Sequence, residues 1–153
     1  MSTTSTYPTT LDTLLTAINA AMSGALAGVK AYEGWPGPDA VREMILFTGM
    51  EWDEYAIPTI KTGRVLRDEV WRAEFELIVA SVETSTPPDP SDARDRAFAI
   101  LAALENLLAN DTTAGATGVL WLEVHPQKAE PRVFEKGWGY GISGVVVCNA
   151  RLS

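Results

Sequence analysis

The chain has very little of the residue types on which most catalytic and metal sites depend. Its 153 residues include one cysteine, Cys148, and one histidine, His125. A single cysteine excludes an intrachain disulfide and is typical of proteins from a reducing compartment. One histidine and one cysteine cannot supply the usual Cys/His ligand set of a zinc site. We therefore expect no metal and no cofactor, and we expect Cys148, in an apolar terminal segment, to be a buried inert thiol.

Basic residues are also in short supply. Twelve Lys and Arg face twenty Asp and Glu, which gives a net charge of -8 and an isoelectric point near 4.6. Nucleic-acid binding depends largely on basic side chains that neutralise phosphates, so a surface that grips DNA or RNA is not expected. An acidic balance mostly serves solubility. The other interpretation is a surface that must not hold on to DNA.

Long hydrophobic runs are missing as well. No segment approaches the roughly 20 apolar residues of a membrane span. The first six residues carry no basic side chain and lead into no apolar run, so a secretory signal is not expected. We predict a flexible N-terminal tail over residues 1–9 and a single domain over residues 10–153. A domain of this size buries roughly 68–70% of the surface that its unfolded chain exposes.

Two segments have the apolar spacing of amphipathic helices. The first runs from about Thr10 to Ala27, with an apolar stripe that includes Leu11, Leu14 and Ile18. The second follows the proline-rich segment 84–90, where Asp89 is a candidate N-cap and Pro90 suits the first helical position. Its apolar stripe comprises Ala97, Ile100, Leu101, Leu104, Leu107 and Leu108.

Strand patterns account for most of the rest. Residues 64–83 predict one long strand, or two strands joined by a bend, because the usual strand has about 5–6 residues. Apolar side chains there alternate with Arg72, Glu74 and Glu76. Shorter strands are predicted over 29–35, 119–125, 131–135 and 138–152. Residues 40–47 fit neither period, and Ile45–Thr48 favours strand by propensity. The expected fold class is α+β, with a mixed, mostly antiparallel twisted sheet and two main helices packed on it.

Residues 49–63 have no clear period and contain Pro58, which predicts a long loop of the kind that usually carries function. Its acidic cluster, Glu51, Asp53 and Glu54, supplies oxygen ligands suited to a divalent cation. The spacing lacks the glycine and the terminal glutamate of a calcium loop. A solvated acidic loop is therefore the favoured interpretation.

Catalytic motifs are not recognisable. The run Gly139–Gly144 matches G-x-G-x-x-G, but an apolar strand pattern follows it where dinucleotide binding needs a helix N-terminus. His125 precedes Pro126, and no serine lies in a nucleophile motif. We predict no catalytic residue and expect that the protein is not an enzyme. A small enzyme with a carboxylate site at Glu51, Asp53 and Glu54 remains a remote alternative.

The order of these elements resembles a known family. A helix, short strands, a long strand with the charged face Arg72, Glu74 and Glu76, a proline-containing turn, a second Leu/Ala helix and a terminal hairpin region are similar to the tail terminator (tail completion) proteins of long-tailed, non-contractile bacteriophages. The resemblance spans about Leu11 to Leu152 and rests on element order, length and texture. It transfers no catalytic residue.

The resemblance implies a structural virion protein. Such a protein forms a ring, usually hexameric, that caps the finished tail tube, ends its polymerisation and joins it to the head connector. The implied partners are other copies of the chain, the tail tube protein and the head–tail connector protein, with no membrane. DNA would pass through without specific binding. The implied location is the virion tail, and the host cytoplasm during assembly.

The candidate assembly residues come from three places: the segment 51–57, which mixes acidic and aromatic residues, the charged face of the strand around Arg72, and Trp138 near a strand end. Tryptophan is a candidate because it is enriched in the buried centres of protein interfaces. We expect the segment 51–63 to contact a neighbouring subunit or the tail tube. The alternatives are a head–tail connector (neck) protein of the same virion and an adaptor domain unrelated to phage. The candidate interface residues are Glu51, Trp52, Asp53, Glu54, Tyr55, Ile57, Arg72, Glu74, Glu76 and Trp138.

Overall fold

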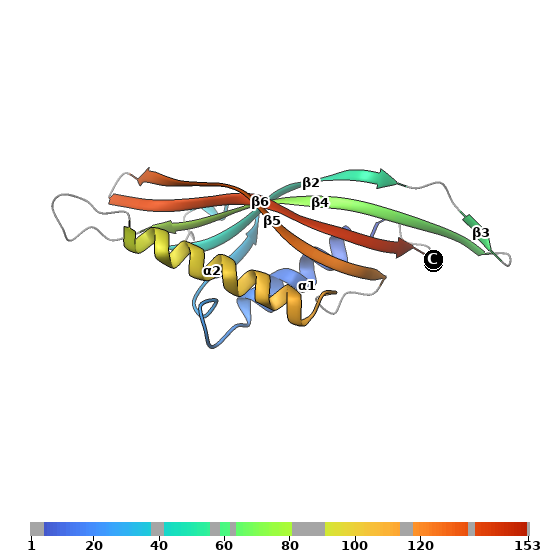
Figure 1. The fold of residues 1–153 in the computed structure, drawn as a ribbon, viewed down its shortest axis with the longest axis horizontal. Coiled ribbons are helices and arrows are strands. Elements are labelled where there is room, and N and C mark those ends of the chain that lie inside the picture. Colours follow the sequence, from blue (N-terminus) through green and yellow to red (C-terminus); the bar gives the residue numbers. More distant parts are fainter. Residues whose placement is uncertain are drawn as a thin grey trace.

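The computed structural model describes residues 5–37, 42–55, 59–61, 64–80, 91–113, 118–134 and 137–152. These residues form two helices and six strands (Figure 1). In chain order the elements are α1 (Tyr7–Asn19), β1 (Lys30–Glu33), β2 (Glu43–Tyr55), β3 (Thr59–Lys61), β4 (Arg64–Ala80), α2 (Ser91–Asn110), β5 (Val119–Phe134) and β6 (Gly137–Leu152).

The strands build one twisted sheet in the order β1-β2-β4-β6-β5, with β3 paired to the start of β4. The β1–β2 pair is parallel, whereas all other neighbouring strands are antiparallel. The expected α+β fold with a mixed, mostly antiparallel sheet and two helices is therefore confirmed. Neither described helix combines the length and apolar character that a membrane span needs.

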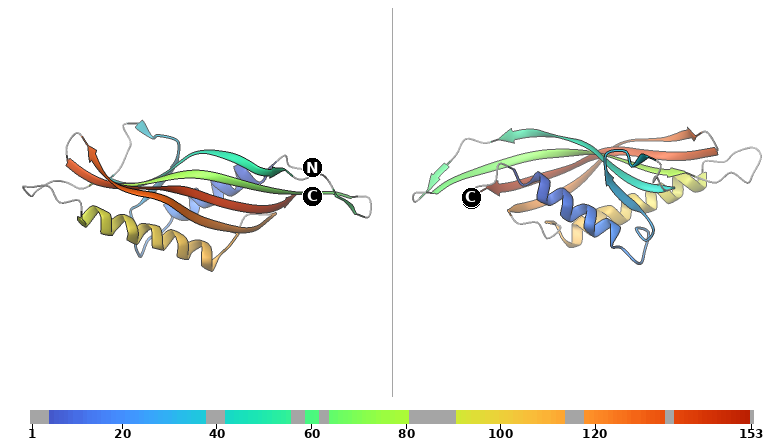
Figure 2. Two further views of the ribbon diagram at one scale, coloured as in Figure 1. Left: turned by 45° about the horizontal axis from the view of Figure 1, so that its top comes forward. Right: turned by 180° about the vertical axis from the view of Figure 1, so that it is seen from behind.

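Both helices pack on the same face of the sheet (Figures 1 and 2). The alternation in β4 explains this, because Trp71, Phe75 and Leu77 share one side of the strand and are all buried in the core beneath the helices. The buried stripe of α2, which includes Ile100 and Leu104, completes the core. The opposite, helix-free face carries a smaller apolar cluster, formed by Met44, Leu46 and Ile78 with Tyr32 and Phe134.

The boundaries of α1 differ from the expectation of Thr10 to Ala27. The helix begins at Tyr7, so residues 7–9, which the sequence assigned to a tail, are helical. It ends at Asn19, whose side-chain amide donates to the Ala31 carbonyl at 3.0 Å and accepts from the Ala31 N–H at 2.8 Å. The predicted apolar spacing continued past this end through Met22, which is 95% exposed, whereas Leu26 in the following turn is buried in the core.

The prediction of a long loop over residues 49–63 is wrong. Strand β2 continues to Tyr55, and β3 occupies Thr59–Lys61. Register shifts between Phe47 and Gly49 and between Trp52 and Glu54 mark two bulges, and each bulge interrupts the alternation of a strand. The sequence therefore showed no clear period where a strand exists. Pro58 lies outside the described residues.

The prediction of two separate strands after α2 is also wrong. β5 is one strand from Val119 to Phe134, where the sequence predicted separate strands at 119–125 and 131–135. A bulge between Pro126 and Lys128 accounts for the apparent break. β4 is also one continuous strand, which is the first of the two alternatives predicted for this segment. Its ladder with β6 runs without a register shift from Arg67 to Ala80. The candidate cap Asp89 lies outside the described residues.

A close approach of backbones makes Gly144 of β6 sensitive to substitution. A Cβ atom there would lie 2.5 Å from the His125 carbonyl oxygen and 2.8 Å from the Pro126 Cα atom. We expect Gly144→Ala to lower the free energy of unfolding by about 1–3 kcal/mol, because the β5 backbone must move. Urea denaturation followed by tryptophan fluorescence measures the change.

Gly49 of β2 is the matched control. A Cβ atom there would meet no other atom within 4 Å. The change in unfolding free energy for Gly49→Ala should stay within about 0.5 kcal/mol. Equal effects of the two substitutions would contradict the packing of β5 on β6 described above.

Candidate functional site

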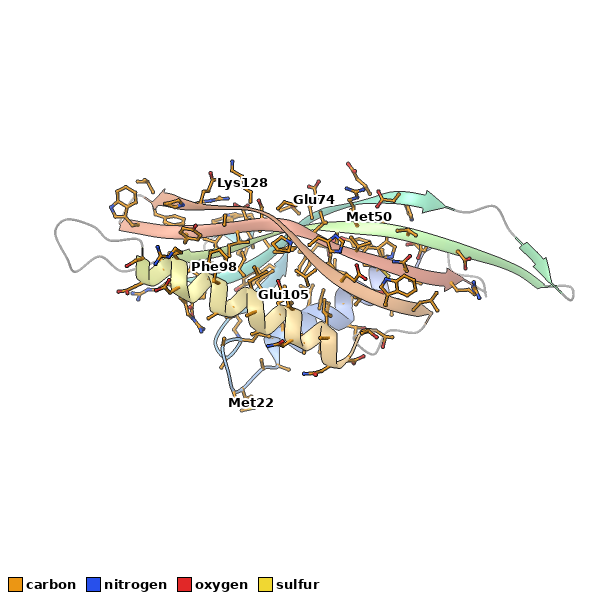
Figure 3. All side chains as sticks on the ribbon, viewed as in Figure 1. Met22, Met50, Glu74, Phe98, Glu105 and Lys128 are labelled. Carbon is orange, nitrogen blue, oxygen red and sulfur yellow. The ribbon has the colours of Figure 1, made fainter. Side chains whose placement is uncertain are left out.

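The helix-free face of the sheet carries half of the predicted interface residues, namely Glu51, Asp53, Arg72, Glu74 and Glu76. Register places Glu51 of β2 opposite Arg72 of β4, and Glu74 and Glu76 follow on the same face of β4. Figure 3 shows Glu74 and Lys128 on the side of the sheet away from the helices. The structure therefore brings the acidic segment of β2 and the charged face of β4 together, as one continuous surface.

Ion pairs cross this face between neighbouring strands. The guanidinium of Arg72 donates to both oxygens of Asp53, with the shortest distance 2.6 Å. This hydrogen bond raises the pKa of Arg72. Arg132 of β5 reaches across β6 to Glu76 of β4. It can do so because Gly141 of β6 has no side chain, and a Cβ atom there would lie 2.4 Å from the Arg132 Nε.

A further pair extends this surface towards the chain's C-terminal end. The Arg151 Nε donates to Asp68 at 2.7 Å, and this hydrogen bond holds the pKa of that carboxyl below its usual value. Pairs this exposed contribute little to folding stability. They keep a helix-free face compatible with water. Among the described residues, no hydrogen bond or ion pair involves Glu74, which is exposed between Arg72 and Glu76.

The remaining predicted residues are more scattered. Trp138 lies at the far end of the sheet, opposite Val133 in the β5–β6 ladder, so it is not part of the surface around Arg72. Glu54 and Tyr55 end β2, opposite Val70 and Glu69. Ile57 lies outside the described residues. The assignment of all these residues to an assembly interface stays a prediction.

A buried carboxylate, Glu69, connects three elements and was missed by the sequence reading. Its side chain is 1% exposed. One oxygen accepts hydrogen bonds from the Thr6 N–H and hydroxyl at 2.5 Å, and the other accepts from the Ser5 hydroxyl at 3.0 Å and the Trp52 indole at 3.2 Å. The Trp71 indole donates to the Thr6 hydroxyl at 3.0 Å. The carboxylate therefore fixes the start of α1 to β4 and β2.

The position of Glu69 also suits the electrostatics of α1. A negative charge near a helix N-terminus is favourable, because the unpaired N–H groups there carry partial positive charge. The sequence contained one signal for this site. Glu69 shares the alternation of Trp71, Ala73 and Phe75, so it is an acid on the apolar face of the strand. Glu74 and Glu76 were predicted as interface residues because they are charged, but they lie on the solvent-facing side of β4.

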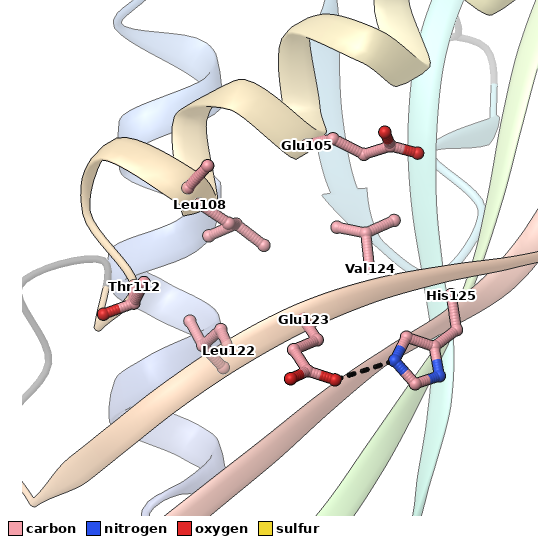
Figure 4. A pocket seen from close by; sticks show the side chains of 8 residues that line it. Glu105, Leu108, Thr112, Leu122, Glu123, Val124 and His125 are labelled. Carbon is pink, nitrogen blue, oxygen red and sulfur yellow. Dashed lines mark hydrogen bonds and ion pairs between the residues drawn. The ribbon is translucent and has the colours of Figure 1, made fainter.

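A groove of about 450 Å³ lies between α2 and the edge strand β5 (Figure 4). Its apolar wall comes from Leu108, Leu122 and Val124. Glu105 of α2 adds a carboxylate. The Glu123 carboxylate and the His125 Nε2, which lie 2.9 Å apart, project from the opposite side of β5 (Figure 4). His125 is thus an exposed strand residue with a carboxylate partner in Glu123.

The described residues contain no group of three or more His, Cys, Asp or Glu side chains able to hold a metal ion. In the acidic segment of β2, Asp53 is occupied by the guanidinium of Arg72. A cation bound there would compete with that positive charge. The candidate cation site at Glu51, Asp53 and Glu54 therefore gains no support from the geometry of Asp53.

The fold and these surfaces define a small α+β protein with one helix-covered and one charged sheet face. No protein-family model matches the chain, and no curated protein matches it. Its fold is similar to a chain in a solved structure described as the virion of a native gene transfer agent (GTA) particle. The TM-score is 0.52 at 15% identity, over 93% of this chain and 91% of that one. At this identity the likeness shows a shared fold over nearly the whole of both chains.

Removing the charge of Glu69 tests its anchoring role. We expect Glu69→Gln to lower the free energy of unfolding by about 1–3 kcal/mol, because charge-assisted hydrogen bonds to a buried group are lost. Glu74→Gln, an exposed change in the same strand, should stay within about 0.5 kcal/mol. Chemical denaturation of both variants gives the comparison, and an unaffected Glu69→Gln protein would contradict the anchor.

The thiol of Cys148 is expected to be unreactive in the folded protein. It is buried, as the sequence predicted, and burial raises its pKa from 9.0 to about 12, while a hydrogen bond with Thr6 acts in the opposite direction. Only thiolate reacts with an aromatic disulfide reagent. At pH 8 the native protein should therefore label slowly and the urea-unfolded protein quickly. Equal rates would show that the thiol is accessible in the native state.

Proposed function

We propose that this chain is a structural virion protein that forms a ring on the end of a tail tube. The ring, of six copies in this proposal, stops tube polymerisation and joins the tail to the head connector. The observation that carries the proposal is the shared fold, over nearly the full length of both chains, with a chain in the virion of a gene transfer agent particle. The element order that resembles tail terminator proteins points the same way.

The surfaces of the molecule fit an assembly role. A ring needs two different patches on each subunit, so that one patch of a copy meets the other patch of the next. The helix-free charged face, the exposed Trp52 of β2 and the α2–β5 groove are distinct patches on different elements. The proposed partners are other copies of the chain, the tail tube protein and the head–tail connector protein.

The charge of the chain fits a conduit for DNA. The net charge is -8, and on the helix-free face the exposed carboxylates of Glu51 and Glu74 lie beside the arginines that pair with other acids. Like charges repel, so a lumen of this chemistry would let DNA pass without binding it. In this proposal the chain acts in the host cytoplasm during assembly and remains in the tail of the finished virion, without catalysing a reaction.

Removing the chain from particle production tests the role. Without a terminator, tube polymerisation has no stop, so we expect tails longer than normal and without heads in electron micrographs. Supplying the wild-type chain should restore normal length. Tails of normal length that lack heads would instead indicate the neck role, and unchanged particles would contradict both.

A single substitution tests whether Trp52 takes part in capping. The Trp52 side chain is 50% exposed, and we expect Trp52→Ala to leave a folded protein that no longer limits tube length. Trp35→Ala, which removes a side chain that is 65% exposed outside the proposed interface, is the matched control and should cap normally. Circular dichroism confirms that each variant is folded before tube lengths are compared.

A further inference from the structure

Trp52 of β2 and the α2–β5 groove lie at opposite ends of one row of residues across the sheet. In the β2–β4 ladder Trp52 is the partner of Trp71. Trp71 is in turn the partner of Cys148 in β6, and Cys148 is the partner of Leu122 in β5. Residues directly opposite in antiparallel strands share a face of the sheet, so Trp52 lies on the helix side, as the buried Leu122 does.

The next row on the helix side ends at the same two places. It runs from Met50 of β2 to Val124 of β5, and both side chains are half-buried against the core. At this level β2 is an edge strand, because β1 pairs only with Met44–Phe47. The helix side of the sheet therefore has Trp52 at one edge and the groove at the other edge, at the same level along the strands.

The exposed half of Trp52 is suited to a protein contact. Its side chain is 50% exposed, although its indole N–H donates to the buried Glu69 at 3.2 Å. This hydrogen bond holds the ring in place, so binding through the exposed part costs little conformational freedom. Tryptophan is also among the residue types that contribute most to binding energy at interfaces.

The α2–β5 groove has the complementary shape and chemistry. Its walls include Leu108, Leu122 and Val124, which lie on the helix side of β5 (Figure 4). Ala109 of α2 also lines it, and this short exposed side chain leaves the groove open. A volume of about 450 Å³ has room for an indole ring, since whole small-molecule sites occupy ~300–1,000 Å³.

The edge of β5 itself is poorly suited to pairing with another strand. The Leu122 N–H already donates to the Thr112 carbonyl at 2.6 Å, and Pro126 has no N–H to donate. On the helix-free side, the row between the two described above ends in Glu51 and Glu123, which would repel each other if the two edges paired directly. A neighbour can therefore use the groove on the helix side, through side-chain packing.

We infer that the Trp52 side chain of one copy packs into the α2–β5 groove of a neighbouring copy. Rotation about a ring axis turns the same sheet face of every copy the same way, so the helix side of one edge meets the helix side of the opposite edge (Figure 2). The two patches differ, and contacts of this heterologous kind can close into rings. The inference rests on the proposed ring and names the contact that would build it.

One substitution on each side of the contact provides the test. Trp52→Ala removes the anchor, and Ala109→Lys places a long charged side chain in the groove. Each should weaken self-association at least about tenfold and move the particle towards the 16.5 kDa monomer. Ala109→Lys leaves the hydrogen bond between Trp52 and Glu69 intact, so its effect cannot come from a loosened anchor. Sedimentation velocity over a concentration series measures the mass.

Two matched variants control for the type of substitution. Trp35→Ala removes another exposed tryptophan, and Ala99→Lys changes an exposed alanine of α2 that does not line the groove. Both should assemble like the wild type. Circular dichroism establishes that all variants are folded.

Mixing the two contact variants separates a heterologous contact from other modes of association. The Ala109→Lys chain keeps its Trp52, and the Trp52→Ala chain keeps its groove, so one contact forms between them and no second contact can follow. The equimolar mixture should therefore contain pairs of two 16.5 kDa chains, about 33 kDa, at concentrations where each variant alone is monomeric.

Several outcomes would overturn the contact. They are a wild-type protein that is monomeric at every concentration, a Trp52→Ala or Ala109→Lys variant with the wild-type mass, and a mixture no larger than its components or as large as the wild-type ring. An intact Trp52→Ala ring that no longer caps tubes would place Trp52 on the tail tube instead. A ring that depends on both residues but does not cap tubes would keep this contact and refute the proposed function. A capping ring that is indifferent to Ala109→Lys would do the reverse.

Discussion

The main hydrophobic core lies on one face of the sheet, and this is the constraint on which the described structure depends. Both helices cover the same side of the sheet, so the apolar alternation of β4 has to point there, and its charged alternation has to face water. A helix-free face without charges would be a large exposed apolar surface, which promotes aggregation. Cross-strand pairs such as Arg72–Asp53 and Arg132–Glu76 keep it hydrated. The same constraint leaves one broad face and a long edge strand available for assembly.

The buried carboxylate of Glu69 solves a local problem that this architecture creates. The start of α1 must be held against the core face of the sheet, where Tyr7 packs on Trp71. Glu69 binds Thr6 and Ser5 at the start of the helix and reaches the Trp52 indole of β2. One acid on the apolar side of β4 thus connects the N-terminal helix to a strand that is a candidate for assembly. The anchor and the exposed part of Trp52 are therefore neighbours.

Regular patterns were predictable from the sequence, and irregular ones were not. The alternation around Trp71 and the helical spacing around Ile100 each reflect many buried contacts. These two patterns predicted β4, α2 and the fold class correctly. The bulges in β2 and β5 shift the alternation by one residue, so the second half of β2 had the pattern of a loop and β5 had the pattern of two strands. The anchor at Glu69 and the α2–β5 groove depend on tertiary neighbours, which spacing along the chain does not encode. Of the candidate interface, the pairing of Glu51 and Asp53 with the Arg72 face required the β2–β4 register.

Single-particle electron microscopy of the purified chain tests the central claim, that these surfaces build a closed head-to-tail ring. Six chains of 16.5 kDa each make a particle of about 99 kDa. The account predicts annular particles of that mass, with every subunit in the same environment and one sheet face of each turned to the lumen. Monomers at all concentrations, or dimers related by a two-fold axis, would contradict it.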